Sequence, residues 1–171
     1  MRCAMQLDLK QVFQQEGFIL PIDLSLDLSD DEVYGVKPFA DPVKITGTVE
    51  NHGSVVMLRY RAEASYTREC DRCLELSSQP MTFKFEHIIS GVEPEDDTSE
   101  EIVFAPDYRV EFDEIAREDI LLEAPTGYLC KQDCKGLCPK CGCNLNNSQC
   151  GCELSEPDPR LAALRKLLEE E

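Results

Sequence analysis

The sequence is short of positive charge, of aromatic residues and of histidine. Its 171 residues include 17 Lys and Arg against 34 Asp and Glu, no tryptophan and two histidines, and the formal net charge is −17. Contacts of Lys and Arg with phosphates supply most of a protein's affinity for nucleic acid. Such an acidic chain must concentrate its few cations to bind RNA, whereas its overall field favours basic partners.

The sequence also lacks a long apolar run. Its first twenty residues, "MRCAMQLDLKQVFQQEGFIL", contain neither an apolar stretch of signal-peptide length nor a small-residue cleavage site. No other stretch is long and apolar enough to span a membrane. We therefore expect a cytoplasmic protein without membrane contact, in a compartment where thiols stay reduced.

Common arrangements of catalytic residues are missing as well. The sequence shows no Gly-rich phosphate loop, no Ser-His-Asp set and no pair of carboxylates tied to a motif. His52 in an "NHG" turn and His87 at the end of an apolar strand are interpreted as structural residues. These features favour a protein that is not an enzyme and that has no small-molecule substrate.

What the chain does contain is cysteine. Seven of its ten cysteines lie in residues 130–152, "CKQDCKGLCPKCGCNLNNSQCGC", and a separate "CDRC" occupies residues 70–73. Disulfides are rare in a reducing compartment. A redox CxxC is expected at the head of a helix in a βαβ unit, and no such unit is visible. Metal binding is therefore the favoured interpretation.

The spacing of the cysteines predicts two four-thiolate sites. A CxxC turn directs two thiolates at one ion, and two such pairs complete a tetrahedron. In "CPKCG", Pro139 stiffens the turn and Gly142 lets backbone N–H groups approach the sulfurs. One site would use four cysteines of the cysteine-rich segment: Cys138, Cys141, Cys150 and Cys152. The other two pairs would share a second ion and tie the middle of the chain to its end: Cys70, Cys73, Cys130 and Cys134.

Zinc is the expected metal, as two structural ions, because closed all-cysteine sites of this spacing are typically structural zinc. A rubredoxin-like iron or an iron–sulfur cluster also accepts four cysteines and stays open as an alternative. Cys3 and Cys143 are left over and are interpreted as ordinary small buried residues. The presence of Cys143 also leaves a different choice of ligands open.

Alternating apolar and polar residues predict a mainly antiparallel β-sheet. In "IDLSLDLSDD" the apolar side chains alternate from Ile22 to Leu28, and "VKITGTVE" directs Val43, Ile45 and Val49 inward. An "NHGS" turn leads into "VVMLRYRAEASYTREC", so this region is predicted to be a β-hairpin. "MTFKFEHI" then continues in register after "CDRC". The first cysteine pair should therefore lie at the tip of a second hairpin.

Further elements follow towards the C-terminus. Residues 91–101, "GVEPEDDTSEE", are interpreted as a solvated loop, with capture of a basic partner as the alternative. "IVFAPDYRVEF" suggests another short strand. In "DEIAREDILLEAP", Asp113 is the expected N-cap and Pro125 ends the helix. In "DPRLAALRKLLEEE", Asp158 caps a C-terminal helix and Pro159 takes its first position.

These elements predict an α+β protein in two parts. Residues 1–125 would form a β-rich domain with hairpins, the CxxC turn and one internal helix. Residues 126–171 would form a Cys-rich zinc module with the C-terminal helix, tied to the first part by the shared zinc site. A chain of 171 residues is long enough for a domain with a real core plus a small module.

The order of these motifs resembles that of the YceD family, the large ribosomal RNA subunit accumulation proteins of bacteria and plastids. The resemblance covers the chain from about Val43 to Leu168, and its most specific parts are "CDRCLE", "DCKGLCPKCG" and "DPRLAALRKL". It marks Cys70 and Cys73 as the most widely shared cysteine pair. It implies a ribosome-assembly factor linked to normal accumulation of large-subunit ribosomal RNA.

The expected function is that of a non-enzymatic factor that binds a large-subunit precursor particle, a basic ribosomal protein or ribosomal RNA. The alternatives are a zinc-stapled adaptor for another basic protein and, less favoured, an enzyme that processes ribosomal RNA. Local RNA binding would need seven cations to converge beside the shared zinc site: Arg59, Arg61, Arg68, Arg72, Lys131, Lys135 and Lys140. The net charge otherwise favours contact with basic protein surfaces.

Overall fold

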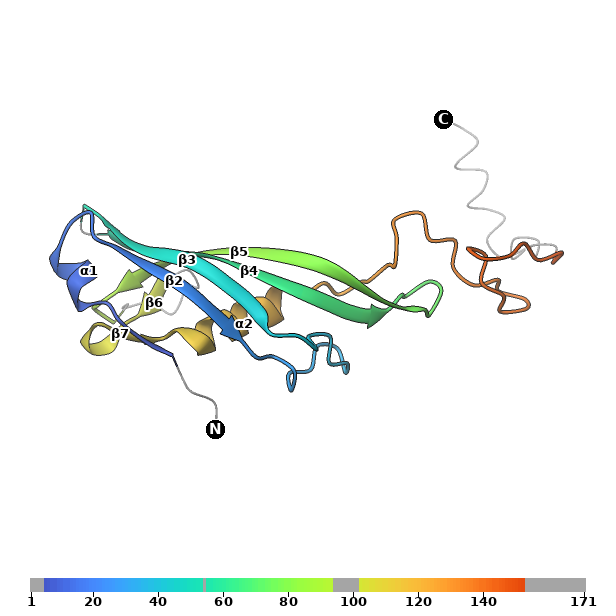
Figure 1. Ribbon diagram of the computed structural model, residues 1–171, viewed down its shortest axis with the longest axis horizontal. Coiled ribbons are helices and arrows are strands. Elements are labelled where there is room, and N and C mark those ends of the chain that lie inside the picture. The colour runs from blue at the N-terminus through green and yellow to red at the C-terminus, as the bar shows by residue number, and fades with distance from the viewer. Residues whose placement is uncertain (1–4, 54, 94–101, 153–171) are drawn as a thin grey trace, which may run out of the picture.

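The computed structural model describes residues 5–53, 55–93 and 102–152. The molecule is elongated, with a long sheet, a helix lying along it and the cysteine-rich segment beyond one end (Figure 1). The predicted C-terminal helix and most of the acidic stretch at residues 91–101 lie outside the described residues. None of the described helices is long and apolar enough to cross a membrane.

Five strands form the main sheet in the order β2-β3-β4-β5-β6. Neighbouring strands run antiparallel except β5 and β6, which are parallel. Their bounds are Ile19–Leu26 for β2, Val43–His52 for β3, Val55–Glu69 for β4, Leu76–Ser90 for β5 and Ile102–Phe104 for β6. A two-stranded sheet pairs β1 (Gln6–Asp8) with β7 (Arg109–Glu111).

The alternation in the sequence decides which face of the main sheet is buried. Val43, Ile45 and Val49 of β3 are fully buried, so the face predicted for this strand is confirmed. The inward residues of β4 are buried as well: Leu58, Tyr60, Ala62, Ala64 and Tyr66. Residues between them face solvent, because successive side chains of a strand point to opposite faces.

The second hairpin reaches far beyond the rest of the sheet. Strands β4 and β5 pair from Val56↔Ile89 to Glu69↔Leu76, over 14 positions, which corresponds to roughly 45 Å at about 3.4 Å per residue. The "CDRC" turn joins the two strands at the far end, as predicted. A rigid antiparallel pair therefore holds the first two cysteines.

The internal helix α2 spans Phe112–Glu123, close to the predicted position. It ends before Pro125, because the residue preceding a proline disfavours the helical region, and Ala124 is extended at ψ 133°. The predicted N-cap is wrong. Asp113 lies inside the first turn, and its Oδ2 accepts a hydrogen bond from the backbone N–H of Met5 at 2.7 Å.

Several short elements were not predicted. "IVFAPDYRVEF" forms two strands rather than one, because a 3₁₀ turn at Pro106–Tyr108 separates β6 from β7. Asp107 and Tyr108 in this turn have positive φ of 53° and 60°, which reverses the chain direction. A short helix, α1 (Lys10–Gln14), follows β1 and packs Val12 into the core.

A shared carboxylate fastens α2 to the sheet. Asp119 Oδ2 accepts a hydrogen bond from the hydroxyl of Tyr60 on β4 and lies 2.6 Å from Nε2 of His87 on β5. Burial, followed by the bond to Asp119, raises the pKa of the Tyr60 hydroxyl, so this group stays protonated and acts as a donor. The contact joins the helix to two strands at once, and His87 is a strand residue as predicted.

We expect Asp119→Ala to lower the free energy of unfolding by about 2 kcal/mol, because it leaves two mostly buried polar partners without their acceptor. Urea unfolding followed by circular dichroism measures the change. Glu123→Ala is the matched control, since Glu123 is an exposed carboxylate on the same helix. Equal losses in the two variants would show that Asp119 contributes no specific fastening.

Candidate metal centres

The first tetrad brings together cysteines that are 57 to 64 residues apart. It consists of Cys70, Cys73, Cys130 and Cys134, whose sulfurs all lie within 4.8 Å of one another. Sγ of Cys70 is 3.7 Å from that of Cys134, and Sγ of Cys73 is 3.6 Å from that of Cys130. Tetrahedral zinc with bonds of about 2.3 Å needs sulfur–sulfur distances of about 3.8 Å. The spacing of the four thiols therefore suits such an ion.

The hairpin tip positions the first two thiols through its own backbone. Leu74 N donates to Cys70 O at 2.9 Å, and Cys70 N donates to Glu75 O at 3.0 Å. Leu74 adopts a left-handed conformation with φ 60°, which closes the turn within five residues. Both thiols are consequently held at the end of the paired strands and are buried.

The segment after α2 docks on this hairpin before it supplies its own thiols. Asp71 N donates to Tyr128 O at 2.8 Å, and Asp71 Oδ2 accepts from Tyr128 N at 2.7 Å. The side chain of Gln79 on β5 donates to the carbonyls of Leu129 and Cys130. These contacts align the segment along the end of the hairpin. The first tetrad is therefore part of an interface that the backbone also stabilises.

The turn residue Arg72 adds a further connection to the same segment. Its Nη1 donates to Cys134 O at 2.9 Å, and its carbonyl accepts from Leu137 N at 3.1 Å. Gly136 lies against Arg72 with φ 73°, and a Cβ at position 136 would lie 3.0 Å from Arg72 O. The close approach of the two segments thus requires glycine at this position.

The second tetrad lies entirely within the cysteine-rich segment. Its sulfurs also fall within 4.8 Å of one another, and they belong to Cys138, Cys141, Cys150 and Cys152. The "CPKCG" turn closes through Gly142 N, which donates to Cys138 O at 2.9 Å, and Gly142 has φ 71°. Cys138 N also donates to Cys143 O at 2.9 Å. The glycine therefore has the conformational role that the sequence suggested.

The two groups of four are the groups predicted from the spacing, and both could hold a metal ion. That the ion is zinc stays a prediction. Cys143 lies beside the second tetrad, where the neighbouring Cys141 and burial raise the pKa of its thiol to about 12. It is therefore a fifth thiol next to a complete set, and Cys3 lies outside the described residues.

Backbone groups favour ionisation within the first tetrad. Burial opposes the ionisation of Cys70, but backbone hydrogen bonds from Cys130, Arg72 and Cys73 outweigh it and lower the pKa of its thiol to about 6. Burial and the adjacent sulfurs raise the pKa of Cys130 to about 12. Without a cation, one thiol thus ionises readily while another keeps its proton.

The second tetrad likewise contains one thiol with a lowered pKa and one with a raised pKa. Backbone hydrogen bonds from Cys141 and Lys140 lower the pKa of the Cys138 thiol to about 6. The neighbouring Cys141 and burial raise the pKa of Cys152 to about 12. The raised values reflect the cost of a further negative charge among thiolates, and a bound cation would remove that cost.

We expect zinc binding to the metal-free protein at pH 7 to release at least one proton per tetrad. Cys130 and Cys152 are protonated at this pH, whereas zinc binds the thiolate. Below about pH 6, Cys70 and Cys138 also become protonated, so the zinc affinity should fall as the pH is lowered. A pH indicator in weakly buffered solution measures the protons, and a chromophoric chelator measures zinc loss between pH 8 and 5. Zinc retention that is unchanged over this range would contradict the prediction.

Sequence reasoning missed one polar residue of the first tetrad. Asn146 Nδ2 donates to Cys134 Sγ at 3.3 Å, and Asn146 Oδ1 accepts from Lys135 N. With Gly136, the Asn146 side chain lowers the pKa of the Cys134 thiol against the effect of burial. The "NLNN" run directly after the "CGC" of Cys141–Cys143 was the available signal, because side-chain amides commonly stabilise metal-bound thiolates.

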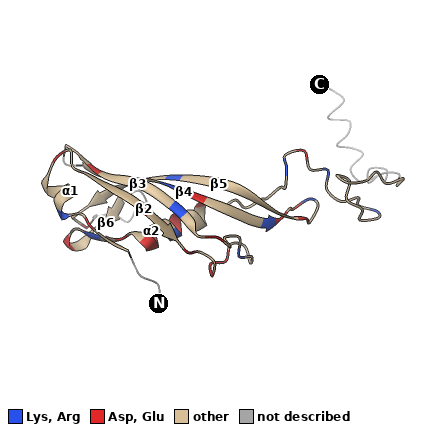
Figure 2. Ribbon diagram, viewed as in Figure 1, with Lys and Arg blue, Asp and Glu red and all other residues tan. Residues whose placement is uncertain are grey.

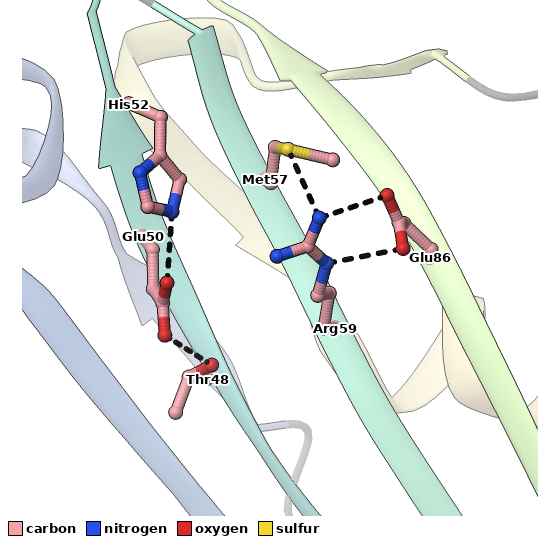
Figure 3. A network of polar contacts seen from close by, with 6 residues as sticks. All are labelled: Thr48, Glu50, His52, Met57, Arg59 and Glu86. Atoms are coloured by element: carbon pink, nitrogen blue, oxygen red, sulfur yellow. Dashed lines mark hydrogen bonds and ion pairs between the residues drawn. The ribbon is translucent and has the colours of Figure 1, made fainter.

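The structure does not bring the seven cations of the predicted RNA surface together. Arg59 and Arg61 lie on the solvent-facing side of β4, roughly 30 Å or more before the cysteine turn at about 3.3 Å per residue. Arg59 pairs with Glu86 through both Nε and Nη2, at 3.0 and 3.2 Å (Figure 3). Arg61 lies 3.9 Å from Glu63. Both sheet cations therefore have acidic neighbours.

The other five cations lie around the hairpin tip and the module (Figure 2). Arg68 is mostly buried, pairs with Asp71 at 3.2 Å and donates to Thr126 O. Among the described residues, no ion pair is seen for the exposed lysines of the module, which are Lys131, Lys135 and Lys140. Arg72 lies in the turn between Cys70 and Cys73, and Lys131 and Lys135 flank Cys134, so these three cations lie beside the first tetrad, whereas Lys140 belongs to the "CPKCG" turn of the second. A role of any of the seven in RNA binding stays a prediction.

Two comparisons with known proteins give the same family name. The family model described as "Large ribosomal RNA subunit accumulation protein YceD" matches residues 58–168, which include both tetrads. The Arabidopsis thaliana protein named "Large ribosomal RNA subunit accumulation protein YCED homolog 1, chloroplastic" is 32% identical over 75 residues, which are 43% of this chain and 23% of that protein. Uncharacterized proteins of Mycobacterium tuberculosis and Mycobacterium bovis are each 27% identical over 169 residues, covering 95% of this chain and 69% of theirs. No solved structure matches the chain.

Proposed function

The chain belongs to the YceD family of large ribosomal RNA subunit accumulation proteins, and on that premise we propose that it supports large-subunit assembly by binding, without catalysing a reaction. The partner would be a precursor particle of the large subunit, engaged through ribosomal protein or ribosomal RNA. Accumulation of the large-subunit RNA would then follow from stabilisation of the particle.

The observation that carries this proposal is the shared tetrad at the hairpin tip. Two of its thiols come from the β4–β5 turn and two from the segment after α2, so one ion would lock both segments into one rigid end. Four thiolates complete a tetrahedron and leave no open position for water or substrate. The centre is thus suited to holding a binding surface in shape.

The distribution of charge supports binding to a particle that contains both RNA and basic proteins. The module presents lysines at the tip, while α2 and the strands beside it carry acidic side chains, among them Glu111, Glu114 and Glu118 (Figure 2). An RNA phosphate could contact these lysines individually, and a basic protein would be attracted by the acidic side chains of α2 and β7. A single elongated factor could therefore contact both components of one precursor.

Sedimentation with ribosomal particles tests the proposal. The tagged protein should move with large-subunit precursors in a sucrose gradient of a cell extract, and Cys134→Ser should remain nearer the top. Cys143→Ser is the matched control, since it removes a thiol outside both tetrads, and it should sediment as the unaltered protein does.

Two other outcomes of this experiment would favour the alternatives. A protein that stays at the top of the gradient but co-purifies with one basic protein would be an adaptor unrelated to ribosomes. Cleavage of naked precursor RNA by the purified protein would indicate a processing enzyme. Either result would contradict a non-enzymatic factor that acts on the particle.

A further inference from the structure

A hollow is lined by elements that lie at the end of the molecule opposite the cysteine-rich segment, where Figure 1 shows β6 and β7. Strand β6, the 3₁₀ turn, β7 and one face of α2 surround it, and its volume is about 540 Å³. Four apolar side chains are part of its lining: Val103, Phe104, Val110 and Ile115. This volume lies within the range of pockets that bind small molecules or single side chains of a partner.

The lining leaves apolar surface open to solvent. The side chain of Phe104 is 39% exposed although its neighbours Ala105 and Val110 are buried. Phe104 is also the last residue of β6, which is the outer strand of the main sheet as described. An outer strand has backbone N–H and C=O groups on one side that an extended segment of another protein can pair with.

Four carboxylates also line the hollow: Asp107, Glu111, Glu114 and Glu118. Glu114 and Glu118 are four residues apart on α2, so they lie on the same face and repel each other. Arg109 is the one cation in the lining. Like charges gathered in one lining are unfavourable in the free protein, and a bound cationic group would relieve their repulsion.

The nearest helix cation is directed to another partner. Arg117 on α2 lies between the two glutamates in sequence, but its Nε donates to Asp31 Oδ1 at 2.8 Å and its Nη2 to the same oxygen. Asp31 is almost fully buried, which fixes the guanidinium at that contact. Among the described residues Arg117 makes no direct ion pair with Glu114 or Glu118, although the charges of both carboxylates add to that of Asp31 in raising the pKa of its guanidinium.

We propose that this hollow, named here the acidic groove, binds an extended Lys- and Arg-rich segment of a partner protein with one apolar side chain placed on Phe104. The proposal rests on the proposed function and specifies its protein contact. The cations of the segment meet the four carboxylates of the lining, and its backbone lies beside β6. Charge complementarity excludes an acidic or phosphorylated segment from this position.

The test uses the full-length protein and a fluorescein-labelled peptide, Lys-Arg-Lys-Leu-Lys-Arg-Lys, with fluorescence anisotropy as the measurement. Because any polycation is attracted to a chain of formal charge −17, the variants must separate local from overall charge. Glu114→Lys with Glu118→Lys alters the groove. Glu32→Lys with Asp41→Lys makes the same change of charge at exposed positions in the connection between β2 and β3.

We expect the groove variant to bind the peptide about tenfold more weakly, since two favourable ion contacts become repulsive. The matched variant should bind less than about threefold more weakly. A peptide with serine in place of leucine should also lose affinity for the unaltered protein but not for the groove variant. Equal weakening in both variants would show attraction by net charge alone, and unchanged binding in the groove variant would show that the groove is not the site. Either result overturns the proposal.

Failure of the acidic-groove proposal can be distinguished from failure of the proposed function. Peptide binding needs no ribosomal particle, and sedimentation with the particle can be measured on the same variants. Absence of site-specific peptide binding together with intact sedimentation removes the acidic groove and leaves the proposed function. Intact peptide binding without sedimentation of the unaltered protein leaves a groove for basic segments in a protein with a different role.

Discussion

Cys134→Ala should release the metal of the first tetrad and unfold the segment that docks on the hairpin tip. Cys134 is buried, and its carbonyl also accepts a hydrogen bond from the guanidinium of Arg72. In small zinc fingers the ion supplies roughly 10 kcal/mol of apparent folding free energy. The remaining contacts of the segment are its hydrogen bonds, the buried ring of Tyr128 against Tyr66, and the side chains of Leu129 and Leu137.

Hydrogen exchange followed by mass spectrometry measures this effect with local resolution. Protection of residues 126–138 and of the turn at 70–75 should be lost in Cys134→Ala, whereas β3 and the paired middle of β4 should keep theirs. Cys143→Ala is the matched control and should leave both regions protected. Full protection of the turn in Cys134→Ala would show that the hairpin holds its shape without the shared ion.

Gly47→Ala should lower the free energy of unfolding by about 3 kcal/mol, the upper part of the usual range for overpacking. Gly47 lies opposite Tyr60 in the β3–β4 pairing. A Cβ at position 47 would lie 2.3 Å from Arg59 O and 2.5 Å from Tyr60 Cβ. These atoms belong to a paired strand and cannot move as the end of a flexible side chain can. The two central strands would have to separate locally.

Urea unfolding measures the effect of Gly47→Ala, with Gly127→Ala as control. A Cβ at position 127 would meet Asp71 Oδ2 at 3.7 Å, which is an ordinary contact. The control should change stability by less than about 0.5 kcal/mol, as surface substitutions usually do. If both variants unfold at the same urea concentration, the close approach of β3 and β4 at Gly47 is not a constraint on the fold.

The long strands and the cysteine groups could be predicted because their signals are periodic or paired in the sequence. Val43 and Ile45 alternate with polar residues, and alternation determines the buried face directly. The CxxC at Cys70 supplies two of the four thiolates that one ion needs. Once the later four cysteines are grouped, the pair that remains to complete this site is Cys130 and Cys134. Local patterns were therefore sufficient for the sheet and for the grouping of the ligands.

Elements that depend on distant partners could not be predicted. Strands β1 and β7 have three residues each, which is too short for a periodic signal, and they form because their segments meet across the fold. The contact of Asp119 with Tyr60 joins residues 59 positions apart. Neither has a signature in the sequence around it.

The dispersal of the seven cations was partly foreseeable. Arg59 and Arg61 are odd-numbered residues of β4 and lie on its solvent-facing side. Arg68 is even-numbered, like the buried Tyr66, and so belongs to the opposite side of the strand. Successive residues of a strand point to opposite sides, so these cations could not all face one surface. What the sequence could not show is that Arg68 turns towards Asp71 and the Thr126 carbonyl.

The most direct test of the account is the metal content of the protein and its cysteine variants by native mass spectrometry. We expect two zinc ions in the unaltered protein, one in Cys70→Ser, one in Cys134→Ser and still one when both substitutions are combined, because the two residues share an ion. Adding Cys138→Ser to either should remove the second. Two ions lost in the combined Cys70 and Cys134 variant, a single ion in the unaltered protein, or iron in place of zinc would contradict the two-centre account.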